Sequence, residues 1–164
     1  MTQASERDWA DAYLAQARAD LGGAKAVQGQ EPSVFAMLLQ MVFEKLAKAA
    51  LLRNGAVTLS WARGTHKAAS RMMSTLRCQR GLLDPVGGSR AWEDVLWVVN
   101  ELENAHPQAA RNAPNLEYPW ETSEGVVQWP ARHLQIAMSL DGTLAVRVLK
   151  FASLLSQRFD QIFP

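Results

Sequence analysis

The side chains of this chain best suited to proton transfer or metal binding are three histidines and one cysteine. His66, His106 and His133 lie far apart in the sequence, and Cys78 is the only thiol. Zinc sites are usually built from cysteines and histidines at short, paired spacings, and a lone cysteine cannot form an internal disulfide. The spacing therefore predicts neither a metal site nor a disulfide, and we expect surface roles for the three histidines.

Two acidic residues have informative positions. Asp20 shares the apolar face of the first predicted helix with Tyr13, so it either meets a cationic or N–H partner or reaches water at the edge of that face. Glu44 and Lys48 have the spacing of a helical ion pair, which we interpret as a surface pair. No two carboxylates have a spacing diagnostic of general acid–base catalysis, so the sequence predicts no catalytic residue.

Length and composition place the chain among globular domains. It has 164 residues, 48% of them apolar and 20% charged, which predicts a single domain spanning residues 1–164. We find no apolar stretch long enough to cross a membrane and no signal-peptide pattern at the polar start, and the single cysteine favours a reducing, cytoplasmic setting. A net charge of +1 excludes a polycation that binds nucleic acid through charge alone.

Charge is unevenly distributed along the chain. From Lys45 to Arg80 there are eight basic residues and no acidic residue, whereas from Leu82 to Glu124 there are eight acidic and two basic residues. Either the folded domain has a positive and a negative face, or these segments are ordinary solvated helix surfaces.

Apolar periodicity and capping signals predict five helices that must position these residues. The second is apolar nearly all round, which is typical of a central helix. Trp92 and Trp97 are expected to face the core from the fourth. The first predicted helix begins near Ser5, where Asp8 completes a capping box, and the second runs from Pro32 to about Arg53. The third starts after Thr65, the fourth runs from about Arg90 to Asn104, and the last covers Asp141 to Phe163.

The segment before the last helix is harder to assign. Val126–Trp129 and Leu134–Ile136 flank Pro130, and we expect a short hairpin or an irregular cover there. Long helices with apolar stripes, joined by modest loops, pack as antiparallel bundles. The sequence therefore predicts an all-α, up-and-down bundle of about five helices.

Several segments resemble the HEPN family, the nucleotide-binding domain shared by higher eukaryotes and prokaryotes. The segment DWADAYLAQARADLGGAKAV is similar to the first helix of that family, and PSVFAMLLQMVFEKLAKAALLRNG, with Glu44, Lys45 and Lys48, is similar to the second. THKAASRMM is similar to the start of the third helix, and Asp141–Phe163 is similar to the closing helix. The resemblance covers most of the chain. It implies a helical bundle that binds a nucleotide or RNA, forms homodimers and often acts with a minimal nucleotidyltransferase partner.

Ribonuclease members of that family carry an arginine, four residues, a histidine, one residue and a tyrosine before the last helix. Arg111 and Tyr118 match the arginine and the tyrosine, but Leu116 occupies the place of the histidine. Leucine can neither transfer protons nor hydrogen-bond a phosphate. The resemblance then implies RNA or nucleotide binding without catalysis, and the candidate binding residues are Arg111, Asn112, Tyr118, Lys67 and Arg71.

The sequence thus predicts a non-catalytic HEPN-like module that binds RNA, a nucleotide or a nucleotidyltransferase partner in a toxin–antitoxin-like context, with no cofactor and no metal. The surplus of apolar positions on the second helix, together with the resemblance, predicts a homodimer. One alternative is a weakly active, metal-independent endoribonuclease toxin in which His106 or His133 replaces the missing histidine. The other is a plain dimerisation or interaction bundle.

Overall fold

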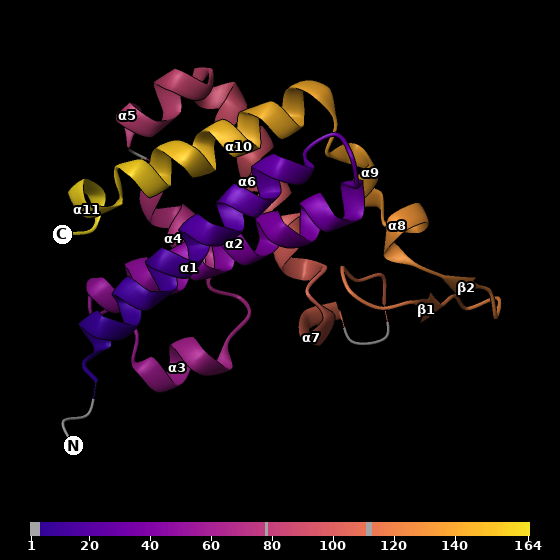
Figure 1. Ribbon diagram of the computed structural model, residues 1–164, viewed down its shortest axis with the longest axis horizontal. Helices are drawn as coiled ribbons and strands as arrows, with labels where there is room; N and C mark the ends of the chain where they lie inside the picture. Colours follow the sequence, from indigo (N-terminus) through magenta and orange to yellow (C-terminus); the bar gives the residue numbers. More distant parts are fainter. Residues whose placement is uncertain (1–3, 78, 111–112) are drawn as a thin grey trace.

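The two longest helices, α1 (Glu6–Val27) and α2 (Pro32–Arg53), form an antiparallel hairpin through the centre of the bundle (Figure 1). The computed structural model describes residues 4–77, 79–110 and 113–164. Helix α1 begins with the predicted capping box, because the Ser5 hydroxyl accepts from the backbone N–H of Asp8 and the Asp8 carboxylate accepts from that of Ser5. These two reciprocal hydrogen bonds fix the residue at which α1 begins.

Helix α2 is the centre of the bundle, as its nearly uniform apolarity predicted. It contacts α1, α4 (Ala69–Leu76), α6 (Gly88–Asn104), α9 (Gln135–Ser139) and α10 (Gly142–Gln157), and most of its residues are buried. The surplus of apolar positions that favoured a dimer is therefore covered by helices of the same chain. The prediction of a homodimer is then supported by the family resemblance alone.

Helix α10 closes the bundle against α1, α2 and α6. Its Phe151 is completely buried between Phe43 of α2 and Trp92 of α6, with ring centroids 6.4 and 5.8 Å away. The all-α prediction of about five packed helices is confirmed. The prediction for Trp97 is wrong, because α6 turns that side chain away from the core and leaves it 45% exposed.

Three boundaries differ from the sequence prediction. An additional short helix, α3 (Leu59–Gly64), precedes α4, and Thr65 is its C-cap rather than the start of α4. Helices α5 (Arg80–Leu83) and η1 (Asp84–Val86) occupy the next connection. The last predicted helix is broken at Arg158 into α10 and α11 (Phe159–Ile162).

A short hairpin precedes the last helices, as one of the two expected forms. It pairs β1 (Trp120–Glu121) with β2 (Val127–Gln128), with Trp120 opposite Gln128, and it extends away from the bundle (Figure 1). Pro130 begins α8 (Pro130–His133) and is followed by α9, so residues 134–136 belong to no strand. The prediction that they pair with Val126–Trp129 is therefore wrong, because the partner of β2 is β1, earlier in the chain. In the part of the chain that is described, no helix has the length and apolarity of a membrane span.

Candidate functional site

A cluster of polar side chains lies where α2 meets the loop before α4 and the end of α6. Its centre is Glu44, whose carboxylate accepts hydrogen bonds from the Lys48 ammonium and the Gln40 amide, both at 2.7 Å. The Glu44 and Lys48 side chains are only 13% and 6% exposed. The interpretation of this pair as a surface ion pair is therefore wrong, because neighbouring helices cover this face of α2.

His66 and His106 face each other beside Glu44. Their imidazole rings stack with centroids 3.9 Å apart and planes 15° apart. His66 Nδ1 lies 3.4 Å from Glu44 Oε1, and His106 Nε2 lies 3.9 Å from Glu44 Oε2. Surface roles were expected for these two histidines because they are distant in sequence, and that prediction is wrong because the fold brings them together and largely covers them.

A buried carboxylate on α6 joins the elements that flank the two rings. Glu103 Oε1 accepts from the backbone N–H groups of Ala69 at 2.8 Å and Ser70 at 3.2 Å, which are the first residues of α4. The first N–H groups of a helix have no partner within the helix, and the helix dipole favours negative charge there. Glu103 thereby fastens the start of α4, which follows His66 in the chain, to the end of α6, which precedes His106.

Burial and hydrogen bonding set the protonation of the cluster. Burial raises the pKa of Glu44, but hydrogen bonds from Lys48 and Gln40 outweigh it and hold the pKa below its ordinary value. Burial, followed by the proximity of His66, lowers the pKa of His106. At neutral pH the cluster therefore contains an ionised carboxylate beside a neutral imidazole.

His106 also caps the short helix α7 (Pro107–Ala110). Its Nδ1 accepts from the backbone N–H of Gln108 at 3.2 Å. A neutral imidazole that accepts at Nδ1 carries its proton on Nε2, the atom that faces Glu44. His106 thus links the cluster to the backbone of α7 through this hydrogen bond.

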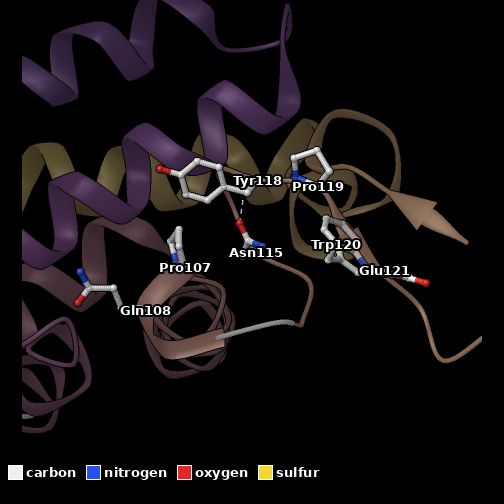
Figure 2. Close-up of a pocket in the computed structure, with 7 residues that line it drawn as sticks. All are labelled: Pro107, Gln108, Asn115, Tyr118, Pro119, Trp120 and Glu121. Atoms are coloured by element: carbon white, nitrogen blue, oxygen red, sulfur yellow. Dashed lines mark hydrogen bonds between the residues drawn. The ribbon is translucent and has the colours of Figure 1, made fainter. Parts of the chain in front are cut away.

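A surface pocket of about 590 Å³ adjoins α7 on the side of the hairpin. Asn115 Oδ1 accepts from the backbone N–H groups of Glu117 and Tyr118, which fixes the turn that presents Tyr118. The Tyr118 side chain is 60% exposed. Figure 2 shows the residues that line the pocket: Pro107, Gln108, Asn115, Tyr118, Pro119, Trp120 and Glu121.

Of the residues predicted to bind RNA, the three that the structure describes do not share one pocket. Tyr118 lines the pocket, whereas Arg111 and Asn112 lie outside the described residues. Lys67 is exposed next to His66. Arg71 donates to the backbone oxygen of Ala56 and lies over the Trp61 ring, so its guanidinium is engaged with the segment around α3.

Leu116 occupies the position where the resemblance places the ribonuclease histidine. Its side chain is 4% exposed, and its backbone N–H donates to the oxygen of Ala105 at the end of α6. His133 is separate from the stacked pair, since its Nδ1 accepts from the backbone N–H of Trp129 and its ring packs against that indole.

The segment from Lys45 to Arg80, which is rich in basic residues, contributes less positive surface than its sequence suggests. Asp20 is buried, as one of the two alternatives foresaw, and it pairs with Lys45 at 2.5 Å. Lys48 pairs with Glu44, and Arg53 pairs with Asp11 and Asp160. Three of the eight basic side chains between residues 45 and 80 are therefore already neutralised by carboxylates of the same chain.

Comparison of the chain with models of known protein families, with curated proteins and with solved structures gives no match.

Proposed function

We propose that the chain is a HEPN-like module that binds RNA or a nucleotide at the Tyr118 pocket without cleaving it. The observation that carries this proposal is a contrast between near neighbours: Tyr118 is exposed at the pocket, whereas Leu116 is buried. Exposed aromatic rings stack on the bases of single strands. The residue in the place of the ribonuclease histidine instead faces the core and offers no group for proton transfer.

The shape and lining of the pocket support this proposal. Its volume of about 590 Å³ lies within the usual range for small-molecule sites. Pro107, Pro119 and Trp120 supply apolar surface, and Gln108 and Glu121 supply polar groups. A flat base can stack on the aromatic and apolar part of such a lining while its edge forms hydrogen bonds with the polar part.

Fluorescence anisotropy with labelled single-stranded RNA and with labelled nucleotides tests the proposal. We expect Tyr118→Ala to weaken binding by about 5- to 150-fold, because stacking on one base contributes about 1–3 kcal/mol. Tyr118→Phe keeps the ring and is expected to bind like the wild type. Trp97→Ala, which removes an exposed aromatic ring on α6, is the matched control.

Two outcomes contradict the proposal. Either the wild type binds neither RNA nor nucleotides, or Tyr118→Ala binds them as tightly as Trp97→Ala does. Thermal melts of all variants establish that each is folded before binding is compared.

A protein-binding function is the second candidate, and the exposed apolar surface near the hairpin favours it. Large apolar side chains are exposed at Tyr118, Val126, Val127, Trp129 and Met138. The resemblance makes a nucleotidyltransferase the expected partner. Val127→Lys separates the two functions in a binding assay, because it places a charge on the hairpin outside the Tyr118 pocket. Loss of partner binding with RNA binding intact would favour the second candidate.

A further inference from the structure

We propose that Glu44, His66 and His106 bind a divalent transition-metal ion, and that Zn²⁺ suits their donor set best. Each residue offers one ligand atom, and the three atoms lie within 4.8 Å of one another. Two imidazoles and one carboxylate form a recognised three-ligand zinc set that leaves the fourth position open for water or a ligand. This inference does not depend on RNA binding.

The fold brings the three ligands together from three separate segments. Glu44 lies in the middle of α2, His106 lies between α6 and α7, and His66 lies before α4, whose start is fixed by Glu103. Ligands that are held in place by such outer hydrogen bonds are the usual arrangement of protein metal sites. The ion would therefore join three elements that already meet.

The charges around the cluster favour a cation. Glu44 and Glu103 line the same small internal space with His66, and Lys48 supplies the opposing positive charge at Glu44. Among the described residues, no group forms a hydrogen bond with the buried His66 Nδ1. A buried nitrogen without a partner is costly, and a metal ion would satisfy it.

Coordination requires two local changes. The lone pairs of an imidazole lie in the ring plane, so two nearly parallel rings do not point at one ion, and at least one ring must turn. Binding through His106 Nε2 also moves the ring proton to Nδ1, which ends the hydrogen bond from the Gln108 N–H. One stacking contact and one hydrogen bond are small compared with the free energy of coordinating zinc.

The second change gives the site a specific signature. Gln108 belongs to α7 and lines the Tyr118 pocket, so an ion on His106 would alter the backbone at the pocket wall. In an NMR titration with ZnCl₂, we expect the amide resonance of Gln108 to shift together with the His66 and His106 ring resonances. The resonances of His133 should not move.

Isothermal titration calorimetry with ZnCl₂ on the full chain tests the proposal directly. We expect one Zn²⁺ per chain in the wild type, and at least about tenfold weaker binding in His66→Gln and in His106→Gln. His133→Gln is the matched control because that histidine is bonded to Trp129 instead. Cys78→Ser removes any contribution of the thiol, and Mg²⁺, which prefers oxygen ligands, should not bind.

X-ray absorption spectroscopy of the Zn²⁺-loaded wild type gives a second test that requires no variant to fold. The proposal expects two imidazole ligands and further oxygen ligands. It is overturned if zinc does not bind saturably, if the absorption spectrum shows sulfur or no imidazole, or if folded His66→Gln and His106→Gln bind zinc as tightly as His133→Gln.

Discussion

The imidazole rings of His66 and His106 stack 3.9 Å apart, although one precedes α4 and the other follows α6. The connection between these elements is the carboxylate of Glu103, which takes the place of a local cap at the start of α4. The residue at the N-cap position, Ala68, forms no side-chain hydrogen bond with this helix. One buried acid of α6 thus joins the start of α4, just after His66, to the helix that ends just before His106.

Glu103→Ala is expected to destabilise the protein. The change leaves the N–H groups of Ala69 and Ser70 without their acceptor, at a cost of about 1–3 kcal/mol for the buried Ala69 group and less for the partly buried Ser70 group. Urea denaturation measures the loss. The control is Glu101→Ala, which removes an exposed carboxylate from the same helix. Equal denaturation midpoints for the two variants would show that Glu103 does not anchor α4.

Phe151→Ala is expected to lower the free energy of unfolding by about 3–5 kcal/mol, because it opens a cavity between α2, α6 and α10. Phe151 is fully buried against Phe43 and Trp92. Lys150→Ala, at the adjacent exposed position, should have little effect. A thermal melt unchanged by Phe151→Ala would contradict the described packing.

Stability should fall at acid pH partly through Asp160. Its hydrogen bond with Arg53 holds the pKa of Asp160 below the ordinary value of 3.8. A carboxyl whose pKa is lower in the folded state stabilises that state above its unfolded pKa, and the contribution disappears as the pH falls through the folded pKa. The loss should therefore occur below about pH 3.8.

Thermal midpoints measured against pH check this prediction. Asp160→Asn should reduce the acid-dependent fall of the thermal midpoint. The control, Glu124→Gln, leaves the Arg53 contacts intact and should keep that fall as in the wild type. Superimposable curves for the wild type and Asp160→Asn would contradict it.

The purified chain is expected not to cleave RNA in the presence of EDTA. Leu116 is 4% exposed, so Leu116→His, which introduces the histidine that the resemblance expects at this position, should bury an imidazole, destabilise the protein by about 1–3 kcal/mol and create no activity. A fluorescent RNA cleavage assay measures this. Cleavage by the wild type that is lost in both Arg111→Ala and His106→Gln would instead support the endoribonuclease alternative.

Light scattering should report twice the chain mass of 18.1 kDa if the chain dimerises as the resemblance implies. Such an interface would bury about 1,200–2,000 Å² in total. Trp97→Lys and Val146→Lys, at exposed apolar positions, test which face is used. A mass near that of one chain at all concentrations would remove this prediction.

Local sequence signals predicted the helices that have local causes. The capping box of Ser5 and Asp8, the end of α2 and the central position of α2 all follow from short-range patterns. The start of α4 does not, because its cap is Glu103, far along the chain. Thr65 looked like a cap for α4 but ends α3 instead.

The candidate site was only partly predictable for the same reason. Tyr118 was identified through the family resemblance, whereas the pairing of His66 with His106 exists only in the tertiary structure. One usable signal was present: Glu103 follows Leu102 and lies one helical turn after Val99, among apolar positions of α6. A carboxylate there requires a buried partner, as Asp20 also did.

The contacts of Arg53 impose an order on biosynthesis. Its guanidinium, at the end of α2, binds Asp11 in α1, Asp160 in α11 and the backbone oxygen of Phe163. The α1–α2 hairpin depends on contacts between neighbouring elements and can form while the ribosome is still translating. Arg53 acquires its last partners only after Phe163 has been synthesised and has left the exit tunnel. The native fold is therefore completed only once the segment through Phe163 is free to fold, and until then the apolar side of α2 that α10 covers stays exposed.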